Sequence, residues 1–225
     1  MTRSAWEILS IVLLAAFCRV SKTAPAPDPR PALFFREDWA ETPAATPITQ
    51  EHVANPDLVL TLYGPGRDGV RKSHHDKPSD DPFYVWSGQC PSNWAVTLRH
   101  RRAEVDLTGL AKIRWRSQQS GFRQLHIILK LANGSWIIGD TGDGESLDWR
   151  VREFNIQDLR WRVLNIKDVV EGARLERPDL SRVDEVGFTD LMPGGSSDAC
   201  SRIDWMEVYG KTVLRVAPEN IGGRF

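Results

Sequence analysis

The chain has 225 residues, and its 29 basic and 30 acidic side chains leave it almost neutral. That length is enough for one domain with a sizeable core. The balanced charge argues against a nucleic-acid-binding protein, which needs clustered Lys and Arg to contact phosphates.

The first 26 residues have the pattern of a signal peptide. Arg3 supplies a positive charge, and residues 8–17 form an apolar stretch. This stretch is too short for a membrane-spanning helix, which takes about 20 residues. Residues 24–26 offer a small-residue cleavage site, and no other stretch approaches membrane length. We therefore expect a protein without a membrane span, secreted or periplasmic after signal cleavage.

Residues 27–57 are expected to form a linker and an N-terminal lead-in. The segment is proline-rich up to residue 32, and residues 33–39 form either a first strand or its lead-in. A short helical turn is expected over residues 49–55. Residues 58–64 then form a strand that ends at a Gly-Pro-Gly turn. Residues 67–82, the longest polar segment, are expected to form a loop outside the core.

The rest of the chain alternates apolar and polar residues at a period of two, which is typical of strands that bury one face. Strands are expected over residues 83–88, 94–99, 105–110, 113–117, 125–131, 135–138, 149–155, 158–164, 183–188 and 203–209. The Asn-Gly pair at residues 133–134 predicts a hairpin turn, and the acidic, glycine-rich residues 139–145 predict a hairpin tip. Many short strands without long helices indicate two stacked sheets over residues 58–212, with residues 213–225 as a tail.

The order of four segments resembles that of galactose-binding-like jelly rolls, which include certain carbohydrate-binding modules and the complex I intermediate-associated protein. The segments are residues 106–114, 149–156, 180–188 and 203–208. The resemblance covers about residues 100–210 and implies an all-β jelly-roll sandwich of two antiparallel sheets. It also implies a structural calcium ion, held by Asp204 with Glu37 or Asp38. Fold alone says little about activity.

Cysteine usage agrees with export. Cys18 would leave with the signal peptide, so Cys90 and Cys200 remain. Two cysteines in an exported domain usually pair, and we expect a disulfide between them. A structural zinc site is not indicated, because neither cysteine has a second one close by.

The polar segment carries the first candidate site. His74, His75 and Asp76 are followed by Asp80 and Asp81, a set that suits metal binding or acid–base chemistry near neutral pH. On a strand the two histidines would face opposite ways, whereas in a loop they could share one ion, and the spacing leaves both arrangements open. The alternative is a solvated polar loop.

Aromatic residues after this segment form the second candidate site. Tyr84 and Trp86 alternate and therefore share a strand face, and Trp94 follows. Arg116, with Arg114 on the same face, suits an acidic sugar because a guanidinium can bind a carboxylate through two hydrogen bonds. The alternative is that the tryptophans pack in the core, which we favour for Trp115, and that the arginines form an outward polar face.

We expect an exported, non-catalytic carbohydrate-binding domain. Stacking is assigned to Tyr84, Trp86 and Trp94. Polar contacts are assigned to His74, His75, Asp76, Asp80, Asp81 and Arg116. One alternative is a secreted glycan-active hydrolase or lyase that uses His74 or His75 with Asp76 or Asp81, although no Gly-x-Ser-x-Gly or His-Glu-x-x-His motif is present. A second alternative, implied by one branch of the resembling family, is an assembly or interaction factor for other proteins. The oligomeric state is not indicated.

Overall fold

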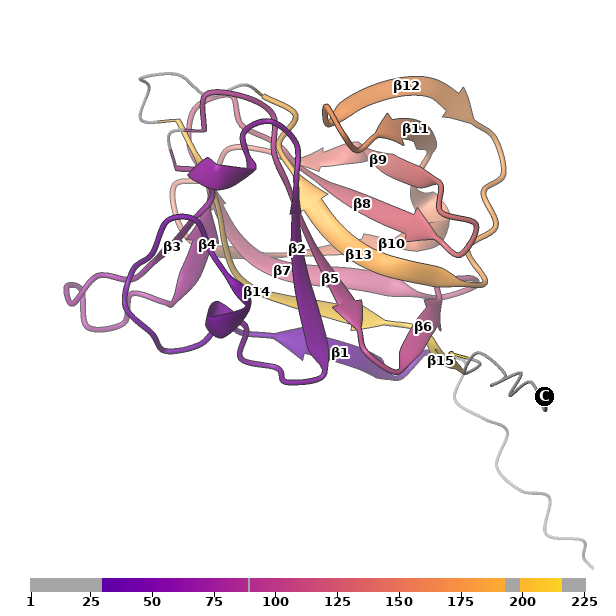
Figure 1. Ribbon diagram of the computed structural model, residues 1–225, viewed down its shortest axis with the longest axis horizontal. Coiled ribbons are helices and arrows are strands. Elements are labelled where there is room, and N and C mark those ends of the chain that lie inside the picture. The colour runs from indigo at the N-terminus through magenta and orange to yellow at the C-terminus, as the bar shows by residue number, and fades with distance from the viewer. Residues whose placement is uncertain (1–29, 89, 193–198, 216–225) are drawn as a thin grey trace, which may run out of the picture.

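The computed structural model describes residues 30–88, 90–192 and 199–215, which form fifteen strands and three short 3₁₀ helices (Figure 1). The strands are β1 (Leu33–Glu37), β2 (Leu58–Tyr63), β3 (Arg71–Ser73), β4 (Tyr84–Trp86), β5 (Ala95–His100), β6 (Ala103–Asp106), β7 (Lys112–Gln119), β8 (Leu125–Leu131), β9 (Trp136–Asp143), β10 (Arg150–Asn155), β11 (Trp161–Asn165), β12 (Val170–Leu175), β13 (Val183–Thr189), β14 (Ser201–Tyr209) and β15 (Lys211–Leu214). The helices are η1 (Gln50–His52), η2 (Arg67–Gly69) and η3 (Ile156–Asp158).

The strands form two sheets. Sheet A has the order β10-β7-β14-β4-β3, and β1 also pairs with β14. Sheet B has the order β12-β11-β9-β8-β13-β5-β2, with β6 and β15 joined to it through β13. Every strand pair is antiparallel. The predicted all-β jelly-roll sandwich is therefore confirmed.

The core lies between the two sheets and follows from the alternation along each strand. In β7 every second side chain is buried, from Ile113 and Trp115 to Gln119, while the residues between them point outward. Trp115 is 0% exposed and packs against Phe154 and Phe188, as expected of a core residue. Burying one large side chain contributes about 1.5–3 kcal/mol, so the inward face of each strand fixes its register.

Sheet B also carries a second, smaller hydrophobic cluster on its outer face. The cluster consists of Ala95, Ile128, Trp136, Ile138, Leu164 and Val169. Tyr63 of β2 packs against Trp136 of β9, with ring centroids 5.0 Å apart, although β5, β13 and β8 lie between these strands. Sheet B therefore curls, and its outer face is partly filled by its own side chains.

The turn between β11 and β12 reaches across this outer face. The Asn93 side-chain amide donates a hydrogen bond to the Val169 carbonyl at 2.8 Å, which holds Val169 at a φ of 53°. Gly64 has a φ of 87°, and a Cβ there would lie 2.5 Å from a Val169 methyl and 2.6 Å from the Asn93 carbonyl oxygen. Only glycine fits this close approach, so Gly64 allows the β11–β12 turn to pack against the Gly-Pro-Gly turn.

Residues 33–37 form strand β1, which confirms the first of the two alternatives for residues 33–39. Strand β1 pairs with Met206–Tyr209 of β14, so the sandwich extends into the segment 27–57 that was expected to be a linker and lead-in. Two other strands were not predicted. Strand β3 lies inside the expected loop of residues 67–82, and β12 is mostly exposed and lacks an alternating pattern.

The expected hairpin tip at residues 139–145 is wrong for most of its length, because β9 continues to Asp143. Asp143 is fully buried and accepts hydrogen bonds from Trp115 Nε1 at 2.9 Å and from the Ser117 hydroxyl. Arg150 forms an ion pair with the same carboxylate at 2.7 Å. These partners allow an acidic residue to end a buried strand.

The predicted disulfide is wrong. Cys90 and Cys200 are both buried and free. Their thiols have different partners: Cys90 Sγ donates to the Ser87 carbonyl, and Cys200 Sγ lies 3.5 Å from the Ser120 hydroxyl. Burial, together with the negative charge of Asp190, raises the pKa of Cys90 to about 12, so this thiol is held in its neutral form.

The predicted signal peptide and most of the predicted tail lie outside the described residues. Within residues 30–215, apart from the gaps, no helix is long and apolar enough to cross a membrane.

Candidate functional site

The structure separates the residues of the polar segment. The His74 ring stacks on Phe83 with centroids 4.0 Å apart, whereas His75 pairs with Asp81. One Asp81 carboxylate oxygen accepts from the His75 backbone N–H at 2.7 Å and lies 3.0 Å from its Nδ1. Asp76 and Asp80 are exposed. The two histidines therefore do not share an ion, and only the pair of His75 and Asp81 comes together.

Of the three predicted stacking residues, only Trp86 offers part of its ring to solvent. Trp94 is 1% exposed and packs edge-on against Phe188 in the core, so its assignment to stacking is wrong. Tyr84 is 4% exposed and packs edge-on against Trp149 at 5.4 Å. Burial also raises the pKa of the Tyr84 hydroxyl. Trp86 is half-buried on the outer face of sheet A.

Trp86 lies at the centre of a row of residues from three adjacent strands. It is in register with Arg71 of β3 on one side and with Arg202 of β14 on the other. Residues in register across antiparallel strands share a face, with Cβ atoms about 5 Å apart. We call Arg71, Ser73, His75, Trp86 and Arg202 the Trp86 platform.

A pocket of about 340 Å³ opens on one side of this platform. It is lined by Arg71, Ser73, His75, Trp86, Lys72, Thr46 and the adjoining alanines 44 and 45. The Arg71 guanidinium lies 5.3 Å from the centroid of the Trp86 ring, and its Nε donates to the Thr46 hydroxyl at 2.8 Å. The site thus combines an aromatic ring with guanidinium, imidazole and hydroxyl groups.

Arg116, the remaining predicted contact residue, already forms an ion pair within the protein. Its guanidinium bonds Asp204 at 2.6 Å and lies 5.5 Å from the centroid of the Trp149 ring. Arg36 and Arg114 are likewise engaged further along the same face. Both lie over the Trp205 ring and form ion pairs with Glu207. Most of the charged side chains on the outer face of sheet A are therefore paired with one another. We call these ion pairs the ladder of paired charges.

The three carboxylates of the predicted calcium site each have other partners. Glu37 is 0% exposed and accepts hydrogen bonds from the backbone N–H groups of residues 39, 54 and 55 at 2.7–3.0 Å. Burial raises the pKa of Glu37 despite these bonds. Asp38 pairs with Arg36, and Asp204 pairs with Arg116. The described part of the chain contains no group of three or more metal-ligating side chains, so the predicted ligand set does not assemble.

Lys72 lies beneath the platform and is buried. It is 1% exposed, its ammonium donates to the Thr42 carbonyl at 3.0 Å, and it lies 4.4 Å from the centroid of the Phe83 ring. No carboxylate among the described residues pairs with it. Burial lowers the pKa of Lys72 to about 8.

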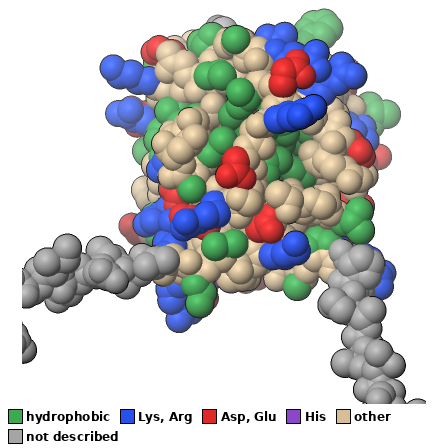
Figure 2. Space-filling model, turned by 90° about the vertical axis from the view of Figure 1, so that its right-hand side faces the viewer, with side chains coloured by type: hydrophobic (Ala, Val, Ile, Leu, Met, Phe, Trp, Pro, Cys, Tyr) green, Lys and Arg blue, Asp and Glu red, His purple; other side chains and the backbone are tan. Residues whose placement is uncertain are grey.

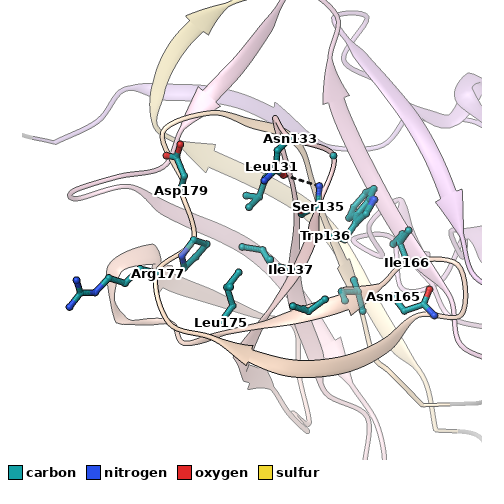
Figure 3. A pocket seen from close by; sticks show the side chains of 14 residues that line it. Leu131, Asn133, Ser135, Trp136, Ile137, Asn165, Ile166, Leu175, Arg177 and Asp179 are labelled. Atoms are coloured by element: carbon teal, nitrogen blue, oxygen red, sulfur yellow. Dashed lines mark hydrogen bonds between the residues drawn. The ribbon is translucent and has the colours of Figure 1, made fainter.

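A larger pocket of about 580 Å³ lies at the opposite end of the sandwich, where β11 diverges from β9 (Figure 3). Leu131, Ile137 and Leu175 point into it. The same end is viewed in Figure 2, where hydrophobic side chains lie in the middle of the face among charged ones. Trp136 is only 8% exposed, so little of its ring is open to a ligand.

The polar groups of this end pocket bond to their own turns. Asn133 Oδ1 accepts from the Ser135 N–H at 2.9 Å, Asn165 donates to Asp168 at 2.8 Å, and Asp179 accepts from the Ser181 hydroxyl at 2.6 Å. This pocket suits an apolar group better than a sugar.

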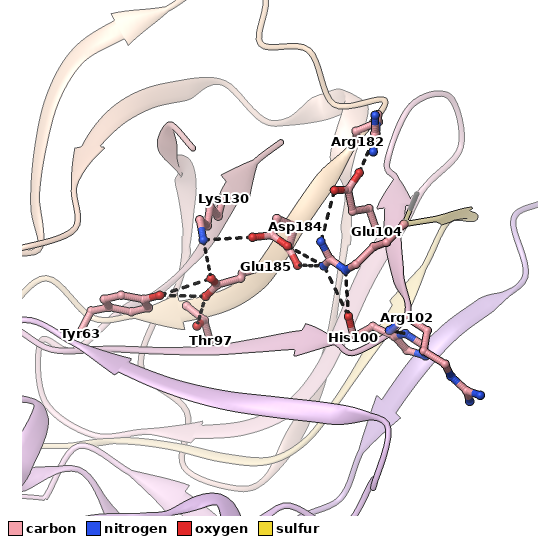
Figure 4. A network of polar contacts seen from close by, with 10 residues as sticks. Tyr63, Thr97, His100, Arg102, Glu104, Lys130, Arg182, Asp184 and Glu185 are labelled. Carbon is pink, nitrogen blue, oxygen red and sulfur yellow. Dashed lines mark hydrogen bonds and ion pairs between the residues drawn. The ribbon is translucent and has the colours of Figure 1, made fainter. Parts of the chain in front are cut away.

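A network of polar side chains lies on the outer face of sheet B (Figure 4). Glu185 is 4% exposed and accepts hydrogen bonds from Tyr63 at 3.1 Å, Thr97 at 2.6 Å and Lys130 at 2.9 Å. Burial and the Glu185 charge raise the pKa of Tyr63 to about 12. Asp184 links Lys130 to Arg215, at 3.0 and 2.5 Å. The network joins four strands and satisfies its own charges, so we interpret it as structural.

The sequence interpretation missed Arg71, Ser73 and Arg202. Arg71 and Ser73 alternate as strand residues on one face do, which was a usable signal. The register between Trp86 and Arg202 joins residues 116 positions apart, and nothing local in the sequence indicates it.

No protein-family model matches the chain, and no curated protein matches its sequence. Among solved structures, the family 11 carbohydrate-binding module of the cellulosomal cellulase Lic26A-Cel5E of Clostridium thermocellum is similar, with 12% identity and a TM-score of 0.45 over 76% of this chain and 97% of that one. The family 11 module from the same organism in complex with a β-1,3-1,4-mixed-linked tetrasaccharide has 12% identity and a TM-score of 0.43, over 79% and 100%. A carbohydrate esterase from a Shiga toxin-encoding bacteriophage, phi24B, has 13% identity and a TM-score of 0.37, over 69% and 90%. Likeness at this level concerns the fold and does not extend to the residues of a site.

Proposed function

We propose that this protein is an exported carbohydrate-binding domain and that its binding site is the Trp86 platform. The observation that carries the proposal is the partly exposed Trp86 ring in a pocket whose other walls carry guanidinium, imidazole and hydroxyl groups. Export is supported by the signal-like pattern of residues 1–26.

The chemistry of a pyranose matches these groups. The C–H face of a sugar ring packs on an indole, which supplies a large apolar surface at little cost in conformational entropy. Sugar hydroxyls both donate and accept hydrogen bonds. Arg71 donates, and the Ser73 and Thr46 hydroxyls both donate and accept. The domain would thus bind a glycan without reacting with it.

A glycan array probed with the mature protein tests the proposal, with Trp86→Ala as the decisive variant. Loss of the stacking ring is expected to weaken binding about tenfold or more. Phe122→Ala is the matched control. Phe122 is 90% exposed, and this substitution removes an aromatic ring that does not belong to the platform. Binding that survives Trp86→Ala in a folded protein would contradict the proposed site. No binding to any glycan would favour a role in protein assembly or interaction.

The contact between His75 and Asp81 favours a second candidate function, glycan cleavage by a hydrolase or lyase. A carboxylate at 3.0 Å from Nδ1 orients the imidazole, as in sites where histidine acts as a general base. His75→Ala separates the two functions. If turnover of a polysaccharide panel disappears while retention on glycan resin stays, the protein is an enzyme. If only retention changes, it is a binding domain.

A further inference from the structure

We propose that the ligand of the Trp86 platform is an acidic polysaccharide, whose sugar carboxylates are bound by Arg71 and Arg202 on either side of the Trp86 ring. This inference rests on the proposed carbohydrate-binding function. It adds the chemical class of the sugar and the residues that select it.

The first observation is the unpaired charge of the two arginines. On the outer face of sheet A, Arg36, Arg114 and Arg116 all form ion pairs with Asp or Glu. Arg71 and Arg202 lie on the same face, and neither forms an ion pair with any carboxylate of residues 30–88, 90–192 or 199–215. Within this ladder of paired charges, the platform is therefore the place where positive charge remains available.

The second observation is that Arg71 is already positioned. Its Nε bonds the Thr46 hydroxyl, and its guanidinium stacks over Trp86. Both contacts leave the two terminal nitrogens free, and these are the atoms that form paired hydrogen bonds with a carboxylate. A side chain held in this way loses less conformational entropy on binding.

The third observation is the absence of competing acid. The lining of the adjoining pocket includes no Asp or Glu among the described residues. Asp81 of the polar segment contacts one lining residue, His75, and does not itself line the pocket. A carboxylate entering the pocket would thus meet donors on its walls and no acidic side chain among them.

The arrangement matches a chain of acidic sugars. Two strand spacings place Arg71 and Arg202 roughly 10 Å apart, with the indole between them. One sugar ring can pack on the part of the Trp86 ring that Arg71 does not cover, while carboxylates on the neighbouring sugars reach the arginines. A nucleic acid would also stack and pair with arginine, but the near-zero net charge and the paired charges elsewhere on this face argue against it.

The test compares polygalacturonate with its fully methyl-esterified form, which has the same backbone without the charge. We expect the full chain to bind polygalacturonate, with affinity that falls as salt rises, and to bind the ester at least about tenfold more weakly. Arg71→Gln and Arg202→Gln should each weaken binding to polygalacturonate about tenfold and weaken binding to the ester by a clearly smaller factor, because only the acid loses its charged partner. Arg160→Gln, which removes the same charge from an exposed position between β10 and β11, should have no effect.

Equal affinity for the acid and the ester, or binding that is unaffected by both arginine variants, would overturn the inference. Tighter binding to dextran sulfate or to a single-stranded oligonucleotide than to polygalacturonate would also overturn it. If the protein binds a neutral glycan, and this binding needs Trp86 but neither Arg71 nor Arg202, the inference is overturned and the proposed function stands. Polygalacturonate binding that needs the arginines but survives Trp86→Ala would instead contradict the proposed site. Thermal melts of all variants establish that each is folded.

Discussion

Replacing Lys72 by methionine is expected to change how the stability of the domain depends on pH. The Lys72 ammonium is 1% exposed and has no carboxylate partner among the described residues, and its pKa falls from 10.5 to about 8. Between these two pH values the unfolded chain holds a proton that the folded protein has lost. The free energy of unfolding therefore rises with pH across this window.

The size of the effect follows from the shift in pKa. Each unit corresponds to about 1.4 kcal/mol, so the wild type should gain up to about 3 kcal/mol between pH 7 and pH 10.5 relative to Lys72→Met. The Thr42 carbonyl and the Phe83 ring both favour the ammonium, which makes this value an upper bound. Methionine keeps the length and apolar character of the side chain without a titratable group.

Urea unfolding of both proteins at pH 7, 8, 9 and 10 measures the difference directly. Groups that titrate in both proteins cancel when the two free energies are subtracted. The reasoning would be refuted if the difference between the two proteins stayed constant over this range, because Lys72 would then keep its proton in the folded state.

Three further predictions concern a buried ion pair, the free thiols and metal binding. Arg123→Met should lower the free energy of unfolding in urea by about 3–5 kcal/mol, because it leaves the buried Asp190 carboxylate without its ion-pair partner. Arg182→Met should lower it by less than about 1 kcal/mol, because Arg182 is half-exposed and its partner Glu104 keeps Arg215; equal losses would contradict this. Cys90 and Cys200 should resist alkylation at pH 8 in the native protein and react in urea without reductant, as peptide mass spectrometry would detect; protection in urea would indicate a bridge. A chelator should leave the melting temperature unchanged, and a lowered temperature would mean that a metal is bound.

The strands were predictable where the alternation was long. Strand β7 buries every second residue along its whole length, and the strand predicted over residues 113–117 lies within it. The Asn-Gly pair at residues 133–134 lies between β8 and β9, where the hairpin was expected, with Gly134 at a φ of 85°. Strand β12 could not be recognised in this way, because it lies at a sheet edge with most of its side chains exposed.

The site was harder to predict than the fold. A tryptophan in an alternating segment can face the core or the solvent, and Trp94 and Trp86 differ in this respect although they lie eight residues apart. Whether Trp86 is open depends on how β4 pairs with β3 and β14. The cysteines show the same limit, since the presence of two of them does not decide whether their thiols are bonded.

Strand β14 pairs with β7, β4 and β1, so sheet A is built around the next-to-last strand of the described chain. Strand β1, which is made first, must wait for its partner at residues 206–209 before it can dock. During synthesis, sheet A therefore cannot close until nearly all of the domain has left the ribosome.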